Sequence, residues 1–458
     1  MAQNCAMRLF PLLALAVGSL LVGCGGAGTS GFEDDAGATH PDGTTPQDDS
    51  GQPIFPDSSV ETAPPCVGLK CQQVTCVSGK TTVSGTVYDP AGFAPLYGVV
   101  VYIPNAPLDP ITHGPVCDSC GGANVSGKPI VTALTDPKGK FVLQDVPVGA
   151  NIPLVMQVGK WRRQITIPNV ASCVDTALTD KNLTRLPKKQ SEGDMPLIAL
   201  ATGCDPMETL IKKIGIDPSE FTNGTGTGAV QVYTGKSGPS NVAAGQTDAY
   251  VFWADKTKMF KYDIIINECE CSPYARPAGA YQNMADYLNA GGRMFGSHYH
   301  INWFSDPTAA PDLKAAATWT AWGSCGTAPY LIDQSFPKGK AMADWMKNVF
   351  PSSVPAQAGQ LNVTSGCIVK DIGATVPGIS QRWVYQQASP SPPAYISINT
   401  PTGSLPDKRC GRAVLSDLHV GTGGTQLAEQ EAALEFMFFD LAACVIDDGK
   451  VPVPPPPN

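Results

Sequence analysis

The chain has 458 residues, a formal net charge of −9, 43% hydrophobic residues and 16% charged residues. This length allows more than one folded domain with a sizeable core. Residues 25–65 contain eight acidic residues and no Lys or Arg, so most of the net charge lies in this segment. The rest of the chain is close to neutral and has no basic patch, so nucleic acid is not expected as a partner.

The N-terminus predicts export and anchoring. An apolar run over residues 9–22 is too short and too early to be a stable membrane span. The sequence LVGC at residues 21–24 resembles the lipobox of bacterial lipoproteins. The resemblance implies that residues 1–23 are a signal peptide and that Cys24 carries a lipid that binds the membrane. Because Gly25 follows rather than aspartate, we expect a cell-envelope lipoprotein of the outer membrane. An ordinary signal peptide with a chance cysteine is the alternative.

Two segments predict little folded structure. Residues 24–65 are rich in Gly, Ser, Thr, Pro and Asp, which favours a disordered acidic linker that spans roughly 35 Å as a coil. Residues 447–458 are proline-rich and are expected to be extended. Between them we expect two folded domains, at residues 66–187 and 194–446.

Cysteine usage agrees with export. Of the 15 cysteines, 13 remain once Cys5 in the signal peptide and the lipidated Cys24 are set aside. So many cysteines in an exported chain are typical of disulfides, and an odd number leaves at least one free or paired between molecules. Cys117 and Cys120 form a CxxC motif in a Gly/Pro-rich loop. We interpret this motif as a local disulfide, with a redox motif or a zinc half-site as alternatives.

Residues 66–187 alternate β-branched and polar residues between turns, which predicts an antiparallel β-sandwich. Strands are expected at residues 82–88, 99–103, 130–134, 140–144, 152–157 and 161–167. The order SGTVYDPAG, GVVVYIP and TDPKGKFVLQDVPVG resembles carboxypeptidase regulatory-like (transthyretin-like) domains, with an insertion at residues 105–128. The resemblance implies a non-catalytic module. Some related sandwiches bind carbohydrate, and Trp161 could stack on a sugar or belong to the core.

Residues 194–446 alternate strands with helical stretches, which predicts an α/β domain with a mainly parallel, flavodoxin-like sheet. A first strand is expected at residues 195–202 and a first helix at 205–214, with Asp205 as its N-cap. Further elements are expected at residues 230–234, 262–267, 280–288, 293–300, 330–333, 338–349, 382–387, 394–399, 412–419 and 426–444, the last of which would be capped by Thr425.

The succession YDIIINECE, ADYLNAGGRMFGSHYH and GRAVLSDLH resembles the class I glutamine amidotransferase-like superfamily, especially its ThuA-like (trehalose-utilisation) branch. The resemblance implies the α/β fold of that superfamily. True amidotransferases carry a nucleophilic cysteine on a sharp turn, whereas this chain has Gly296, Ser297 and His298 where that turn would fall. Glutamine hydrolysis is therefore not expected. The layout of the whole chain also resembles lipoproteins of myxobacteria.

Three of the five histidines define the candidate site. His298 and His300 end one expected strand, on which residues two apart share a face, and His419 ends another. Ligands bind beyond the carboxyl ends of such strands, so the three imidazoles would meet there with Asp417 or Glu268. The set predicts a catalytic site, or a metal site in which the three histidines hold zinc. Structural histidines beside an aromatic patch are the alternative.

A second motif, Glu268-Cys269-Glu270-Cys271, follows the expected strand at 262–267. Its carboxylates could carry acid–base chemistry, and Cys269 could be a reactive thiol beside a histidine. We favour disulfides for these cysteines, to Cys325 or elsewhere.

Two functions are consistent with these patterns. One is a surface binding or scaffolding module of the cell envelope, with carbohydrate or another envelope component as ligand. The other is an exported hydrolase, metal-dependent if zinc is bound, with a His-rich site at the carboxyl edge of the α/β sheet. Metal content and the effect of His298→Ala on ligand binding would distinguish them.

Overall fold

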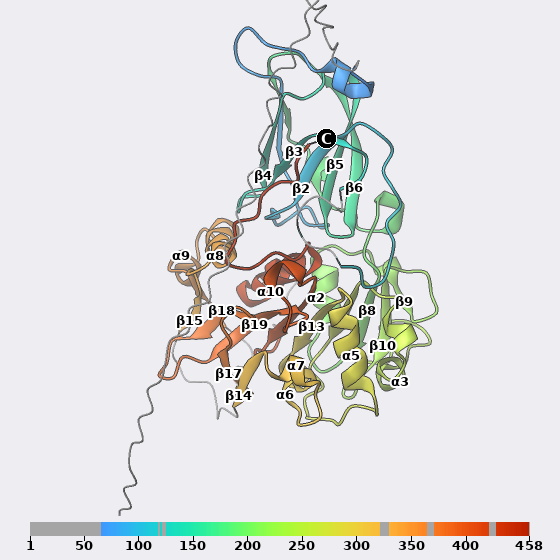
Figure 1. The fold of residues 1–458 in the computed structure, drawn as a ribbon, viewed down its shortest axis with the longest axis vertical. Coiled ribbons are helices and arrows are strands. Elements are labelled where there is room, and N and C mark those ends of the chain that lie inside the picture. The colour runs from blue at the N-terminus through green and yellow to red at the C-terminus, as the bar shows by residue number, and fades with distance from the viewer. Residues whose placement is uncertain are drawn as a thin grey trace, which may run out of the picture. The chain divides into compact units, whose positions relative to one another are not determined.

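The computed structural model describes residues 66–117, 120, 125–320, 329–363, 371–420 and 427–457. These residues form one compact unit that combines several sheets with helices (Figure 1). The expected signal peptide, Cys24 and the acidic linker lie outside the described residues, as do Cys325 and Thr425.

Seven strands of the N-terminal part form two small sheets, with the orders β4-β1-β7 and β3-β2-β5-β6. These strands are β1 (Thr82–Thr86), β2 (Val100–Pro104), β3 (Pro129–Leu134), β4 (Lys140–Gln144), β5 (Gly149–Val158), β6 (Trp161–Val170) and β7 (Asp175–Leu178). Their pairings are antiparallel except that of β1 with β7. Val83 and Leu143 from one sheet share a core with Val101 and Leu154 from the other.

The remaining strands build a mixed sheet of eleven strands, in the order β11-β10-β8-β12-β13-β20-β19-β18-β15-β16, with β9 paired to β10. They are β8 (Ile198–Thr202), β9 (Phe221–Asn223), β10 (Val230–Thr234), β11 (Thr247–Asp248), β12 (Ile264–Asn267), β13 (Arg293–Ser297), β15 (Tyr330–Ile332), β16 (Gln360–Leu361), β18 (Ser380–Gln386), β19 (Pro393–Thr400) and β20 (Gly411–Ser416). Strands from β11 to β20 are parallel, and those from β20 to β16 are antiparallel. Strands β14 (Ala317–Thr320) and β17 (Asp371–Thr375) pair separately.

The parallel half of this sheet is ordered so that a ligand site is expected at one point. Without the short β9 and β11, its strands lie second, first, third, fourth, fifth when numbered along the chain. Doubly wound sheets with this order bind ligands beyond the carboxyl ends of the strands, where the winding reverses. That reversal falls between β8 and β12.

Helices cover both faces of the parallel strands because these strands are apolar on both sides. Along β8, Ile198 and Leu200 enter one hydrophobic core, and Ala199 and Ala201 enter the other. The first face packs on α2 (Met207–Lys213), α8 (Pro337–Val349) and α10 (Glu429–Ala442). The second packs on α3 (Ala249–Trp253), α5 (Ala280–Asn289), α6 (Asn302–Ser305) and α7 (Pro311–Lys314). The short helices α1 (Lys181–Thr184), α4 (Lys256–Met259) and α9 (Val354–Gln357) complete the set.

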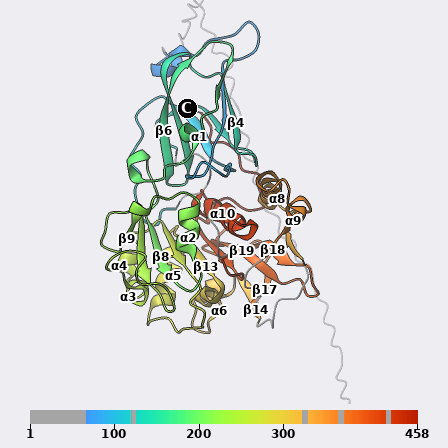
Figure 2. The same cartoon turned by 180° about the vertical axis from the view of Figure 1, so that it is seen from behind.

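Helix α10 lies between the sandwich strands and the large sheet, as Figure 2 shows from behind. It is buried on nearly all sides, and its buried residues include the polar Gln430, Glu431 and Glu435. Trp161 is fully buried against this helix, with its ring 5.5 Å from that of Phe438 and 5.4 Å from that of Phe439. The assignment of Trp161 to carbohydrate binding is therefore wrong, because no face of its ring is open to a sugar.

Five disulfides join described cysteines: Cys66–Cys71, Cys76–Cys173, Cys117–Cys410, Cys120–Cys444 and Cys204–Cys271. The prediction of a local Cys117–Cys120 disulfide is wrong. The insertion that carries these residues packs on the α/β part, where the Cys120 N–H donates to the Val445 carbonyl at 2.9 Å. Five disulfides are typical of a periplasmic or extracellular protein. Among the described residues, no helix is both long and apolar enough to cross a membrane.

Candidate active site

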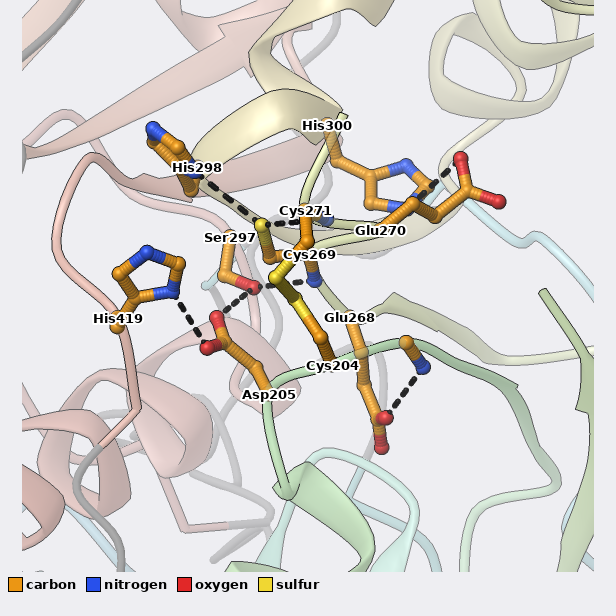
Figure 3. Close-up of a disulfide and its surroundings, with 11 residues drawn as sticks. Cys204, Asp205, Glu268, Cys269, Glu270, Cys271, Ser297, His298, His300 and His419 are labelled. Carbon is orange, nitrogen blue, oxygen red and sulfur yellow. Dashed lines mark hydrogen bonds and ion pairs between the residues drawn. A yellow bond between two sulfur atoms is a disulfide. The ribbon is translucent and has the colours of Figure 1, made fainter. Parts of the chain in front are cut away.

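The expected strand through His300 ends earlier than the sequence pattern predicts. Strand β13 stops at Ser297, and His298 takes a left-handed backbone conformation with φ +43° before a 3-10 helix over His298–Ile301. The prediction that His298 and His300 share one face of a strand is therefore wrong. The turn sends their side chains into two different environments (Figure 3).

Cys269 stands at the centre of the first environment. It follows β12, is fully buried, and is the one free cysteine among those the structure describes. Its Sγ lies 3.2 Å from Nδ1 of His298. Its backbone N–H donates to Ser297 Oγ at 2.8 Å, and its Sγ accepts the Cys271 N–H at 3.3 Å.

His419 faces the same sulfur from the segment after β20. Sγ of Cys269 and one nitrogen from each of His298 and His419 all lie within 4.8 Å of one another, and the two imidazole rings are 4.8 Å apart. His419 Nδ1 lies 2.6 Å from Oδ1 of Asp205. The hydrogen bond to Asp205, and then the one to Cys269, raise the pKa of His419 to about 10. At neutral pH this imidazole is therefore protonated.

Asp205 belongs to this site and is not a helix cap. The structure starts α2 at Met207 with Pro206 as its N-cap, so the predicted capping role of Asp205 is wrong. Its buried carboxylate accepts the Ser297 hydroxyl at 2.8 Å in addition to bonding His419. Two contacts thus fix the carboxylate that orients the imidazole, as in a Cys–His–Asp arrangement.

Glu268, one of the predicted catalytic residues, points away from the histidines. Its buried carboxyl accepts the Gly203 N–H at 2.7 Å and the Glu208 N–H at 3.1 Å. Burial, followed by the charge of Glu208, raises its pKa well above the usual range. Glu268 therefore ties down the loop between β8 and α2, which carries Asp205.

The strand expected to place Asp417 and His419 on one face ends before both of them. Strand β20 ends at Ser416, so the strand alternation on which that prediction rested stops before Asp417. The Asp417 backbone N–H donates to the Ala394 carbonyl at 2.7 Å. Burial, and then the charge of Asp417, raise the pKa of Tyr330 to about 12, which places the carboxylate near Tyr330 on β15.

His300 lies in the second environment, a buried polar cluster of its own. Its Nδ1 faces the Trp303 indole N–H at 3.0 Å and the Arg276 guanidinium at 3.2 Å. Arg276 is paired with the buried Glu270 and lies over the rings of Trp253 and Trp303. Burial, and then the charge of Arg276, lower the pKa of His300 well below its usual value. A neutral, enclosed histidine of this kind holds the fold together.

The predicted zinc ligands are thus only partly brought together. His298 and His419 lie close together and His300 lies elsewhere. The third possible ligand is the sulfur of Cys269. A thiolate and two imidazoles are donors that zinc accepts, so this group could hold a metal. A second group, Cys204, Cys269 and Cys271, includes two cysteines already joined in a disulfide.

Of the Cys–His–Asp arrangement, sequence reasoning named His419 as a site residue and gave Cys269 a reactive thiol only as an alternative. The disulfide favoured for Cys269 is wrong, because this cysteine is free. The odd cysteine count predicts a free thiol, but the spacing does not say which cysteine is free. Asp205 carried no usable signal, because an Asp-Pro pair before an apolar stretch is also a typical helix start.

The sequence matches no family model and no curated protein. Among solved structures, it is similar to a ThuA-like protein from Parabacteroides merdae, at 13% identity and TM-score 0.31 over 56% of this chain and 93% of that chain. A ThuA-like protein from Bacteroides uniformis is similar at 10% identity and TM-score 0.29, over 53% and 89%. A cohesin–X-dockerin complex from Acetivibrio cellulolyticus aligns at 16% identity and TM-score 0.15, over 31% and 75%. These TM-scores are too low to assign a function.

Proposed function

We propose that this protein is an exported hydrolase with a thiol nucleophile. The observation that carries the proposal is the convergence of Cys269, His419 and Asp205 at the carboxyl edge of the parallel sheet, where the winding reverses. A nucleophile, a base within reach of it and a carboxylate that orients the base are the three parts of an acyl-transfer site.

The chemistry follows from the order of the three groups. In the proposed step Cys269 reacts as a thiolate, and its proton is the one held by the His419 imidazole. The sulfur attacks an acyl carbon and forms a thioester, while the bond to the leaving group breaks. His419 gives its proton to the leaving group and then takes one from the water that cleaves the thioester. Asp205 keeps Nδ1 of the imidazole occupied, so the other ring nitrogen faces the sulfur. The substrate class is an ester, thioester or amide.

We propose an amidotransferase-like, ThuA-like fold for the α/β part, with a displaced nucleophile. The strand order and the left-handed turn at His298 support this assignment. A histidine occupies the turn where amidotransferases have their cysteine, and the thiol comes instead from the end of the neighbouring β12. This displacement fits the expectation that glutamine is not the substrate.

A metal-dependent hydrolase is the second candidate, favoured by one observation. Cys269, His298 and His419 offer a sulfur and two nitrogens within 4.8 Å. In that case zinc would be the metal and would supply a nucleophilic water at neutral pH. Elemental analysis of the purified protein separates the candidates, because stoichiometric zinc is expected only from the second.

We also propose that a lipid on Cys24 holds the protein at the cell envelope, most simply at the outer membrane. The LVGC sequence at residues 21–24 and the disulfides in the folded part support this location. Metabolic labelling with a fatty acid tests it: wild type is labelled and Cys24→Ala is not. An unlabelled wild type would contradict it.

Hydrolysis of p-nitrophenyl acetate by the metal-free full chain tests the proposed function. Cys269→Ser is expected to lower the rate about a thousandfold or more, and His419→Ala about a hundredfold. His113→Ala is the matched control, since His113 pairs with Asp263 away from the site and should keep nearly full activity. No hydrolysis by wild type, or hydrolysis unaffected by Cys269→Ser, would favour a binding or scaffolding module instead.

A further inference from the structure

A disulfide lies next to the candidate nucleophile. The Cys204–Cys271 disulfide lies beside Cys269, and the three sulfur atoms are all within 4.8 Å of one another (Figure 3). A free thiol at this distance from a disulfide is within reach of an exchange reaction, which begins when a thiolate attacks a disulfide sulfur. The proposed hydrolysis makes no use of this disulfide.

The backbone brings Cys204 and Cys269 close enough to be joined. The Cys204 N–H donates to the Cys269 carbonyl at 2.6 Å. The segment before Cys204 is equally near, because a Cβ on Gly203 would stand only 2.2 Å from that carbonyl oxygen. Disulfides need Cα atoms about 4.4–6.8 Å apart, a requirement that a direct backbone hydrogen bond between the two cysteines favours. A bond between Cys269 and Cys271 would instead have to close a small ring across one residue.

The two sides of this sulfur cluster differ in exposure. Cys269 is fully buried, whereas Cys204 and Cys271 are both exposed. A reagent in solvent therefore meets the disulfide before it meets the thiol. On the buried side, Nδ1 of His298 lies 3.2 Å from Sγ of Cys269.

We propose that Cys204, Cys269 and Cys271 form a thiol–disulfide exchange centre. The Cys269 thiolate attacks Sγ of Cys204, and a Cys204–Cys269 bond forms as the Cys204–Cys271 bond breaks. Cys271 leaves as a thiolate and takes a proton from solvent. One disulfide and one thiol are present before and after, so no oxidant or reductant is consumed.

The exchange moves reactivity from the interior to the surface. In the exchanged form the buried sulfur is blocked and Cys271 is an exposed thiol, which can react with small thiols or disulfides in an oxidising compartment. The centre therefore gives the chain an exchange activity toward small thiols and disulfides. This inference needs the thiol at Cys269 but does not depend on the proposed hydrolysis.

Trapping with iodoacetamide tests the exchange on the full chain. The native, non-reduced protein is alkylated, quenched in acid and mapped by mass spectrometry without reduction. Wild type is expected to carry label on Cys271 together with a Cys204–Cys269 disulfide. In Cys269→Ser both signals should be lost, with only Cys204–Cys271 remaining. Cys117 and Cys410 are the internal control, since they lie in another disulfide and should stay unlabelled.

Two results would overturn the proposal. One is label on Cys269 alone, or on no cysteine of the cluster, with the Cys204–Cys271 disulfide intact in every molecule. The other is label on Cys271 that persists in Cys269→Ser, because the thiol would then arise without exchange. Ester hydrolysis is measured separately on the same wild-type sample, so either activity can fail while the other is observed.

Discussion

At the scale of single residues, the candidate site depends on how one carboxylate holds one imidazole. Asp205 is buried, and His419 is the member of the arrangement that reaches solvent, with 18% of its side chain exposed. The chemistry proposed for Cys269 requires the His419 imidazole to be protonated and to be oriented with its second ring nitrogen toward the sulfur. Both conditions come from the 2.6 Å contact with Asp205.

Asp205→Asn is expected to lower the pKa of His419 from about 10 toward its ordinary value of 6.5, because the hydrogen bond to the carboxylate is its main cause. A raised histidine pKa stabilises the fold fully below pH 6.5, and this contribution is lost as the pH rises through about 10. Wild type should therefore lose stability between these values, and the variant should lose less. NMR titration of the ring and thermal unfolding at pH 7 and pH 10 measure both effects. An unchanged His419 titration in Asp205→Asn would contradict this assignment.

At the scale of elements, the loop after β8 must approach the loop after β12 very closely. A Cβ on Gly203 would lie 2.2 Å from the Cys269 carbonyl oxygen and 2.6 Å from that of Glu268. Backbone atoms on both sides leave no flexible side chain that could move aside. The glycine is therefore required for Asp205 to reach His419.

Gly203→Ala is expected to lower the free energy of unfolding by about 1–3 kcal/mol, because the two loops must separate. It should also lower the rate of ester hydrolysis. Gly403→Ala is the matched control, since a Cβ there meets nothing within 4 Å. Chemical denaturation measures the difference, and equal stabilities of the two variants would show that the close approach is not required.

Much of the element order could be predicted from the sequence. The sandwich strands, most of the YDIIIN strand and the first five residues of the strand expected at 293–300 are confirmed, because short-period alternation and continuous apolar runs are local signals. Where β13 ends could not be predicted, since residues 293–300 read as one strand and the turn at His298 comes from the surrounding fold. For the same reason, the sequence does not predict that His300 lies apart from His298, or that Asp205 belongs to the site.

At the scale of the whole molecule, two disulfides and one buried helix join the sandwich to the α/β part. Cys117–Cys410 and Cys120–Cys444 close loops of 293 and 324 residues. While Cys117–Cys410 is intact, the Cys120–Cys444 bond closes only a short loop, made of residues 117–120 and 410–444. The two contributions are therefore not additive.

Replacing Cys120 and Cys444 by alanine should lower the free energy of unfolding by about 4 kcal/mol. Replacing Cys117 and Cys410 as well should lower it by about 6 kcal/mol more. The Cys66–Cys71 bond, with a sequence separation of 5, is the control and should cost only about 2 kcal/mol. Denaturant unfolding of the three variants gives the comparison. Equal costs for the long and short loops would refute the cross-linking role.

A buried pair of acids between the sandwich and α10 makes the stability of the whole unit depend on pH. Burial raises the pKa of Asp89 to about 6, and burial followed by the charge of Asp89 raises that of Glu435 well above its usual value. An acid whose pKa is raised by folding stabilises the fold fully while it is protonated in both states, which for Asp89 means below its ordinary pKa of 3.8. This stabilisation is lost as the pH rises through about 6.

Glu435→Gln is expected to raise the free energy of unfolding at pH 7.5 by on the order of 2 kcal/mol, because an amide needs no proton to be buried beside Asp89. The gain should shrink toward pH 4. Unfolding at pH 4, 6 and 7.5 measures it, with Glu429→Gln on the same helix as a control. A gain that is independent of pH would point to packing rather than titration.

The measurement that tests the central claim most directly is the site of acylation by an activated ester. The full chain is mixed with p-nitrophenyl acetate, stopped in acid within one turnover and mapped by mass spectrometry. We predict one acetyl group per molecule on Cys269, absent in Cys269→Ser and strongly reduced in His419→Ala. An acetyl group on another residue, or none on wild type, would contradict the assignment of Cys269 as the nucleophile.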